Sequence, residues 1–454
     1  MGRKYKMSSL ISLGGIVLSL CALIYCAYKG RSIIWVAPVC VVIVAVTSGL
    51  NVLDAYLVDY IRGMAEYVVS WFPAFFLGAV YGKIMDMTGS ARALANKLVS
   101  IVGPRFAIIS VILPCLLMTY GGISVFVVAF VIYPMGYAIY REANLPRTLL
   151  PGAIAFGAFG ITMMAIPGTP QIQNIIPTTY YGTNATAAPL MGIVATILMG
   201  VPGYLYLEWR CRCARKKGLG FVEDPKHTEV VVDASQQSSW QWVTGLIPLV
   251  VVVFMLNVLP GILAKHNIIE LTTNQAIVIA LLGGIATACL INLKRVKVLL
   301  PAIDAGSNGS LLAIMNTACA VGFGSVVKIV PGFTLLKNAL LSMPGSILFS
   351  EAVAVNVLSG ATGSASGGIS IALETMSAQY LERAISMGMS PDLLHRVAVL
   401  SGGLGTLPHN GAVLTLLAVS NCKHKESYID ICVTACIIPT VVSLLVSFIW
   451  GLFV

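Results

Sequence analysis

The chain has 454 residues, of which 57% are hydrophobic and only 10% are charged. This composition excludes a soluble globule of the ordinary kind and indicates a polytopic membrane protein. The net charge of +10 does not indicate nucleic-acid binding, because the basic residues stand in short clusters at the ends of apolar runs. That placement is typical of the cytoplasmic loops of membrane proteins.

Long apolar runs predict membrane spans, because about 20 apolar residues are needed to cross about 30 Å of hydrocarbon. The first run is no cleavable signal, since it is long, lacks a small-residue cleavage site and is followed at once by another run. The remaining apolar stretches are shorter or are broken by Gly and Pro. The uninterrupted runs lie near residues 8–28, 32–50, 66–82, 188–207, 243–263, 275–292 and 429–453.

The basic clusters predict the sidedness of the chain. If the first basic cluster is cytoplasmic, counting the spans that follow places the second and third clusters on the cytoplasmic side as well. Counting back places the N-terminus outside, although the basic residues at 3–6 compete with Lys29 and Arg31 for the cytoplasm. The three clusters lie at 210–217, 294–297 and 423–425.

Two apolar runs are interrupted by Gly, Ser and Thr, at residues 119–124 and 365–370, and both interruptions contain Gly-Gly-Ile-Ser. In hydrocarbon an unpaired backbone group is costly, so a helix break at membrane depth is tolerated only where it is packed in protein or lines a polar cavity. A matched pair of breaks points to the binding site of a secondary transporter. We therefore predict a first re-entrant hairpin around Gly121 and a second around Gly367.

The features around the two motifs recur in one order. Lys83 stands almost as far before Gly121 as Lys328 stands before Gly367, and each hairpin is followed by a second break. An odd number of crossings separates the halves, which predicts inverted repeats with a shared site at the membrane midplane. The first break lies at 167–174 and the second break at 405–411.

These features predict a division of the chain into N-terminal segments, two repeats and a connection between them. The connection contains the one notably polar stretch, and this composition predicts a solvated cytoplasmic linker. The predicted divisions are 1–65 for the N-terminal transmembrane and amphipathic segments, 66–208 for the first repeat, 209–305 for the linker and connecting spans, and 306–454 for the second repeat.

The substrate site is predicted from neutral polar side chains and glycines at the four interruptions. Half-helix N-termini direct N–H groups and partial positive charge into a cavity, so an anion can be bound without a buried Arg. Neutral donors suit a small monocarboxylate better than a citrate trianion. The alternative is that Ser and Gly only allow close helix packing. The predicted substrate-binding residues are Thr119, Tyr120, Gly121, Gly122, Ser124, Thr169, Gln171, Asn174, Ser359, Thr362, Ser364, Ser366, Gly367, Gly368, Ser370, Thr406, His409 and Asn410.

Proton coupling is predicted for His409, the only histidine expected at membrane depth, with the other four in loops or at span ends. A histidine can hydrogen-bond a substrate and can titrate near neutral pH. Glu351 and Glu374, which flank the second hairpin, are alternative proton carriers. Sodium is an alternative coupling ion, because carbonyl and hydroxyl oxygens at the hairpin tips can also coordinate Na⁺.

Enzyme activity, a metal site and a cofactor are not predicted. The 11 cysteines are scattered, and neither a His-Glu-x-x-His pattern nor a P-loop pattern occurs in the sequence. An anion channel is the alternative of a different class. Substrate counterflow distinguishes a carrier from an open pore.

The run at 118–130, followed by 167–174, resembles the gluconate permease (GntP) family of the ion transporter superfamily, and most closely its hydroxybutyrate and citrate-transporter-like branch. The resemblance covers nearly the whole chain and is most specific between residues 74 and 190. It implies an all-α polytopic fold with two inverted repeats, each with a re-entrant hairpin and a broken transmembrane helix. It also implies a homodimer and elevator-type transport of organic anions.

The chain departs from this family at two places. Gluconate permeases carry an acidic residue near the first hairpin tip, where this chain has Thr-Tyr-Gly-Gly, and they place Asn and Asp after the His that corresponds to His409. The missing acids argue against gluconate itself and against a family-like proton relay. We predict a cytoplasmic (inner) membrane symporter of a small hydroxy-monocarboxylate (hydroxybutyrate, lactate or gluconate-like) and H⁺, with the lipid bilayer but no nucleic acid as a partner.

Overall fold

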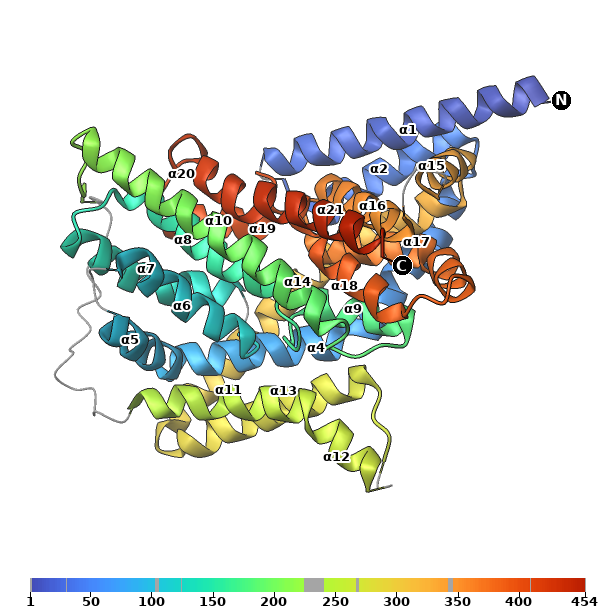
Figure 1. Ribbon diagram of the computed structural model, residues 1–454. Helices are drawn as coiled ribbons and strands as arrows, with labels where there is room; N and C mark the ends of the chain where they lie inside the picture. The colour runs from blue at the N-terminus through green and yellow to red at the C-terminus, as the bar shows by residue number, and fades with distance from the viewer. Residues whose placement is uncertain are drawn as a thin grey trace.

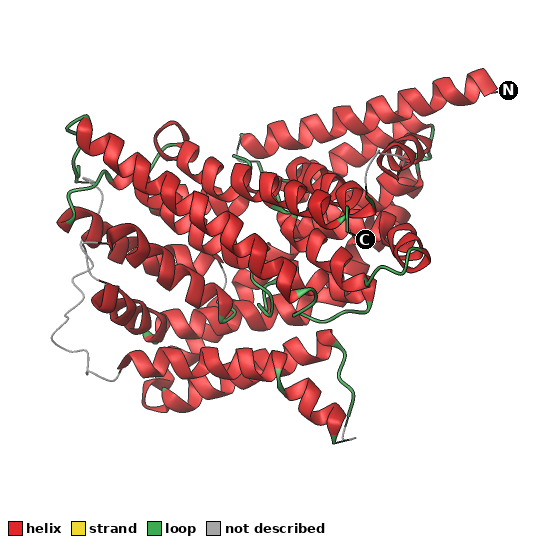
Figure 2. Ribbon diagram, in the orientation of Figure 1, coloured by secondary structure: helices red, strands yellow, loops and turns green. Residues whose placement is uncertain are grey.

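The computed structural model describes residues 2–29, 31–102, 106–123, 125–223, 241–266, 269–341, 346–408 and 410–453. Helices joined by turns and loops make up this described part of the chain (Figures 1 and 2). Such an architecture satisfies backbone hydrogen bonds within each segment, as hydrocarbon requires.

The two halves of the chain present similar elements in the same order. The first half consists of α1 (Gly2–Tyr28), α2 (Ile33–Ser48), α3 (Val52–Asp54), η1 (Ala55–Tyr60), α4 (Ile61–Met87), α5 (Ser90–Val102), α6 (Ala107–Tyr120), α7 (Val125–Glu142), η3 (Arg147–Leu149), α8 (Leu150–Ala155), η4 (Phe156–Thr162), α9 (Ile172–Tyr181) and α10 (Pro189–Lys216). The second consists of α11 (Gln241–Asn257), α12 (Leu259–Lys265), α13 (Thr273–Ile291), η6 (Leu293–Arg295), α14 (Val296–Ile329), α15 (Pro331–Leu341), α16 (Ile347–Thr362), α17 (Ala365–Ser386), α18 (Pro391–Leu400), η7 (Gly403–Thr406), α19 (Gly411–Val419), α20 (His424–Ile431), η8 (Cys432–Ile437) and α21 (Ile438–Trp450).

The long helices α4 and α14 pack closely and run in opposite directions. A Cβ atom on Gly63, near the start of α4, would lie 2.0 Å from Oγ of Ser325, near the end of α14. One on Gly306, near the start of α14, would lie 2.6 Å from Cα of Val80 in the later part of α4. Because α4 and α14 hold equivalent places in the two halves, their opposite directions mean that the repeats are inverted. The predicted all-α polytopic fold is confirmed.

Each half begins with a helical pair that packs on the other half. The pair α1–α2 contacts α14 and α15, and the pair α11–α13 contacts α4 and α5. The amide of Gly332 in α15 donates to Oγ of Ser12 in α1 over 3.0 Å, and Gly245 in α11 approaches the carbonyl of Ser90 in α5. Figure 1 shows the two pairs at opposite edges of the molecule.

The described residues contain 5 helices long and apolar enough to cross a membrane, or 6 if α11 and α12, bent by 41°, count as one span. The predicted spans at 8–28 and 32–50 correspond to α1, which has 27 residues, and to the shorter α2. Helix α2 has 16 residues, which reach about 24 Å at about 1.5 Å per residue, short of the ~30 Å of hydrocarbon. Residues 31–33, at the start of α2, line the central cavity described below, and α1 and α2 pack together as the two arms of a hairpin.

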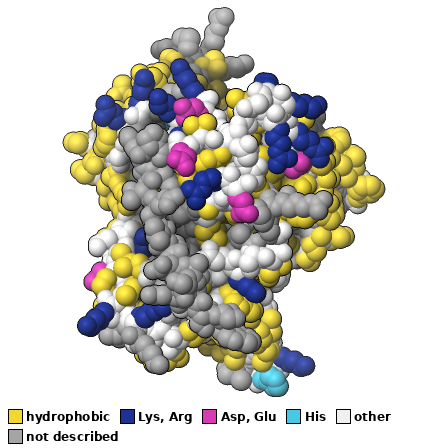
Figure 3. Space-filling view, turned by 90° about the vertical axis from the view of Figure 1, so that its left-hand side faces the viewer, with side chains coloured by type: hydrophobic (Ala, Val, Ile, Leu, Met, Phe, Trp, Pro, Cys, Tyr) yellow, Lys and Arg dark blue, Asp and Glu magenta, His cyan; other side chains and the backbone are white. Residues whose placement is uncertain are grey.

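The three basic clusters share one end of the molecule. Arg210 at the end of α10 binds Asp430, beside the cluster at 423–425, and the amide of Phe221 donates to Asn144 after α7. Arg295 donates to the carbonyl of Thr88 at the end of α4. Figure 3 shows Lys and Arg side chains gathered on this end. The positive-inside rule predicts that this end faces the cytoplasm.

Candidate functional site

A cavity of about 470 Å³ lies where the two repeats meet. Both hairpin tips and both breaks reach it, so segments far apart in the sequence build one site. Helices α4, α13 and α14 supply much of the remaining wall. The lining includes Gly122, Val125 and 170–173 from the first repeat, 362–366, Thr406 and 410–412 from the second, and 31–33 from the α1–α2 turn.

The first hairpin consists of α6 and α7, and its tip contacts the first break. Gly122 has φ +92°, a conformation that residues with a side chain rarely adopt. A Cβ atom there would also lie 3.2 Å from Cγ of Pro170 in the first break. The side chain of Gln171 donates to the carbonyls of Thr119 over 2.7 Å and of Ile123 over 3.4 Å. These bonds tie the first break to the first hairpin tip.

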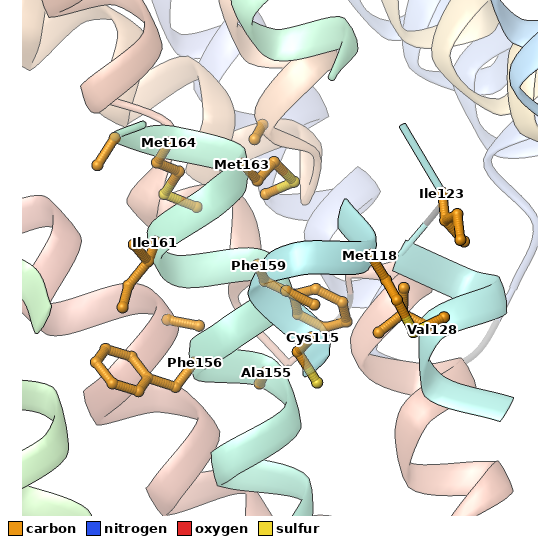
Figure 4. Close-up of a cluster of buried hydrophobic side chains, with 14 of the residues drawn as sticks. Cys115, Met118, Ile123, Val128, Ala155, Phe156, Phe159, Ile161, Met163 and Met164 are labelled. Carbon is orange, nitrogen blue, oxygen red and sulfur yellow. The ribbon is translucent and has the colours of Figure 1, made fainter. Parts of the chain in front are cut away.

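Apolar packing continues this connection below the tip. Figure 4 shows Phe159 of η4 beside Cys115 and Met118 of α6. All three side chains are buried, and Gly157 allows the approach, because a Cβ atom there would lie 2.7 Å from Cβ of Cys115. The first hairpin and the first broken helix therefore form one packed body.

The second hairpin consists of α16 and α17, and Ser364 shapes its tip. Its Oγ accepts a hydrogen bond from the amide of Gly367 over 3.1 Å and so caps α17. Oγ of Ser366 lies 3.2 Å from Oγ of Ser364, and Thr362 donates to the carbonyl of Leu358. The first turn of a long helix and several hydroxyls thus border the cavity, an arrangement that favours negative charge.

The second break is tied to the second hairpin tip by Asn410. Its Nδ2 donates to the carbonyls of Gly363 over 3.0 Å and Gly405 over 2.7 Å, and its Oδ1 accepts from the amides that begin α19. Asn410 therefore ties the second break to the second hairpin tip, as Gln171 ties the first break to the first tip. The amide positions differ in sequence, but each fastens a break to the neighbouring hairpin.

The predicted substrate-binding residues fall into three groups. Those that line the cavity are Gly122, Gln171, Thr362, Ser364, Ser366, Thr406 and Asn410. Those that the structure places outside the lining are Thr119, Tyr120, Gly121, Thr169, Asn174, Ser359, Gly367, Gly368 and Ser370. Ser124 and His409 lie outside the described residues.

Several of the second group have clear packing or bonding roles. Thr119 turns its hydroxyl to the carbonyl of Cys115 over 2.7 Å, and Gly121 packs against Leu249 of α11. Gly368 allows close contact with Ser359, whose Cα would lie 2.2 Å from a Cβ atom at that position. Gln173, which was not predicted, does line the cavity, and its Oε1 has no hydrogen-bond partner among the described residues.

Comparison with known proteins shows the family to which the chain belongs. The family described as GntP family permease matches residues 11–344. The chain is 37% identical over 443 residues to the uncharacterized transporter YxjC of Bacillus subtilis (strain 168), covering 92% of this chain and 94% of that protein. The chain belongs to the GntP permease family. It is a multi-pass membrane transporter and not an enzyme.

The crystal structure of the Alcanivorax borkumensis YdaH transporter, described as having an unusual topology, resembles this permease in fold. The TM-score is 0.50 at 15% sequence identity, with 88% of this chain and 90% of that chain covered. At that identity the likeness concerns the fold alone.

The permease also contains a buried polar cluster that the sequence did not reveal. Arg396 of α18 is fully buried and donates to Asn174 over 3.0 Å and to the carbonyl of Ala187 over 2.7 Å. The neighbouring His395 lies 2.6 Å from Oγ1 of Thr183. The prediction that His395 lies in a loop or at a span end is wrong, because His395 is buried inside α18. Its partner Thr183 lies more than 200 positions away in the sequence, so no local pattern indicated the contact.

The two predicted acidic proton carriers differ in their surroundings. Glu351 of α16 is fully buried, and one carboxyl oxygen accepts from the hydroxyl of Tyr181 in α9, while the other has no hydrogen-bond partner among the described residues. Glu374 of α17 is partly exposed and forms an ion pair with Lys328 over 2.7 Å. The Glu374 pair joins α17 to α14, and the Glu351 contact joins α16 to α9.

Proposed function

We propose that this permease carries a small organic anion, a hydroxy-monocarboxylate of the hydroxybutyrate or lactate type, in symport with a proton. The observation that carries the proposal is the shared cavity, to which both hairpin tips and both breaks contribute mainly uncharged donors. Amide and hydroxyl groups at half-helix N-termini can bind one carboxylate and one hydroxyl without a buried ion pair. A trianion would need more positive charge than the breaks and tips supply.

The size of the cavity supports a small substrate. Small-molecule sites commonly enclose about 300–1,000 Å³ and are mostly apolar with a few placed polar groups. The permease cavity, at about 470 Å³, combines apolar walls from α4 and α13 with the amides of Gln171, Gln173 and Asn410. This lining suits a short carbon chain with a polar end.

Glu351 is the described residue best placed to hold the coupled proton. A carboxylate buried without a compensating charge is costly, and proton binding removes that cost. Its partner Tyr181 stands at the end of α9, whose first turn holds the cavity residue Gln173. A shift of α9 on substrate binding would therefore change the surroundings of the proton. His409 is retained as the second candidate from the sequence.

Elevator-type transport by a homodimer is the proposed mode of movement. Gln171 and Asn410 fasten each break to its hairpin, while α4 and α14 pack against each other through glycine contacts. These contacts support one body that moves with the substrate and one that stays in place. The ion pair between Lys328 and Glu374 crosses from α14 to α17 and would break when the bodies slide.

The test of the proposal is counterflow in proteoliposomes. A panel of carboxylates is first ranked by thermal shift of the purified protein, and the best ligand is then loaded inside vesicles. We expect radiolabelled ligand to accumulate transiently by exchange, and a pH gradient to drive net uptake in Na⁺-free buffer. Efflux without exchange would identify a channel. Strict dependence on Na⁺ would replace the proton as the coupling ion.

A further inference from the structure

Arg31 occupies an unusual place for a basic residue of a membrane protein. It stands in the turn between α1 and α2 and lines the central cavity together with Ser32 and Ile33. Among the described residues of that lining, it is the only one with a charged side chain. It is exposed, and within the described part of the chain its guanidinium takes part in no hydrogen bond or ion pair.

The hairpin that carries Arg31 is held firmly in place. Cys40 of α2 donates to the carbonyl of Ser19 in α1 over 3.2 Å, which fastens the two arms together. At the far end, Ser12 contacts Ser48 over 2.7 Å and accepts from the amide of Gly332 in α15. Ser32 caps α2 by accepting from the amide of Ile34. Arg31 therefore stands at the cavity end of a hairpin whose arms are fastened to each other and to α15.

The sequence alone suggested another role for this charge. Arg31 and Lys29 were counted as topology signals that compete with the N-terminal basic residues. The structure places Arg31 in the lining of the central cavity, whereas the three basic clusters lie together at one end of the molecule. A lone exposed cation at a cavity of neutral groups instead attracts anions into it.

We infer that Arg31 supplies the positive charge that recruits and pairs with the carboxylate of the substrate at the α1–α2 turn. This inference rests on the proposed function, which makes the substrate an anion. Neutral donors at the hairpin tips and breaks then share the carboxylate with Arg31 and bind the hydroxyl group of the substrate. Arg31 accordingly acts as a specificity-determining residue that distinguishes carboxylates from uncharged analogues.

The test compares Arg31→Gln and Arg31→Lys with Lys29→Gln in reconstituted full-length protein, with radiolabelled 3-hydroxybutyrate counterflow as the assay. Lys29 is the matched control, because it lies in the same turn but has its Nζ 5.8 Å from the ring centroid of Tyr25. We expect Arg31→Gln to raise KM at least about tenfold, the effect of losing one charged hydrogen bond, with the maximal rate unchanged. Arg31→Lys should restore most of the affinity, and Lys29→Gln should behave as wild type.

Salt dependence gives a second readout that a merely structural role would not change. KM of the wild type should rise with ionic strength, because salt screens the attraction, and KM of Arg31→Gln should not. An unchanged KM in Arg31→Gln, or equal effects of Arg31→Gln and Lys29→Gln, would overturn the inference while leaving carboxylate transport intact. If wild-type protein exchanges no carboxylate in the panel, the proposed function fails, and this inference fails with it.

Discussion

Glu351 combines complete burial with a carboxyl oxygen that has no hydrogen-bond partner among the described residues. The sequence predicted it as an alternative proton carrier because it flanks the second hairpin. The structure adds its link through Tyr181 to the helix that begins at the cavity. In the proposed symport, the proton and the substrate would therefore both act on α9.

The first prediction concerns coupling. Glu351→Gln keeps the shape and a carbonyl oxygen that can accept from Tyr181, so the variant should still exchange substrate across proteoliposome membranes. It should no longer accumulate substrate in response to a pH gradient, because the titratable group is gone. His409→Gln is made in parallel. Normal pH-driven accumulation in Glu351→Gln together with its loss in His409→Gln would move the proton to His409.

Side-chain direction explains why only some of the predicted site residues line the cavity. The motif segments reach the cavity, but Thr119 bonds to its own helix and Asn174 is fully buried. Neither outcome follows from residue type. The same limit hid Arg396, because a basic residue after Pro391-Asp392 looks like a span end until its partners at 174–187 are known.

At the scale of elements, Arg396 joins α18 to the turn before α10. Its guanidinium donates to the carbonyls of Ala185 and Ala187 and to Oδ1 of Asn174. Buried acceptors left without a donor cost about 1–3 kcal/mol each. The turn and the helix therefore depend on one side chain.

The second prediction follows from that contact. Arg396→Leu should lower the free energy of unfolding by at least about 2 kcal/mol, since several buried acceptors lose their donors. Arg212→Leu is the control, because Arg212 is exposed and pairs with Glu208 on the surface, where such pairs contribute up to about 1 kcal/mol. Thermal unfolding in detergent measures both. Equal stability of the two variants would show that the Arg396 bonds contribute little.

The N-terminal hairpin shows what hydropathy could not determine. Runs of 15–20 apolar residues are equally compatible with complete spans and with the arms of a hairpin that ends inside the protein. Which of the two arrangements forms depends on whether the residues between the helices lie in a polar environment. Arg31 and Ser32 line the cavity. The cavity is built from segments far apart in the sequence, so hydropathy alone cannot predict this environment.

At the scale of the whole molecule, the inverted repeat could be predicted because similar sequence features recur in the same order in both halves. Lys83 and Lys328 lie near the ends of equivalent helices, each followed by an amphipathic helix and a hairpin. The packing of each initial pair on the opposite repeat could not be predicted. That arrangement depends on contacts between α1 and α15, and between α11 and α5, which have no local sequence signal.

The third prediction tests the inversion. Single cysteines replace Arg141, at the base of the first hairpin, and Glu382, near the base of the second, in a cysteine-depleted variant. An impermeant thiol reagent should label position 141 only from the cytoplasmic side and position 382 only from outside, because inverted hairpins open to opposite faces. Labelling of both positions from one side would contradict this arrangement.

The central claim is that the two repeats build one substrate site. The most direct measurement is protection of single cysteines at Gln173 in the first repeat and Ala412 in the second, both of which line the cavity. A cysteine at Glu382, remote from the cavity, serves as the control. We expect the transported carboxylate to slow alkylation at positions 173 and 412 with the same concentration dependence and to leave alkylation at position 382 unchanged. Protection at only one cavity position, or at neither, would contradict a shared site.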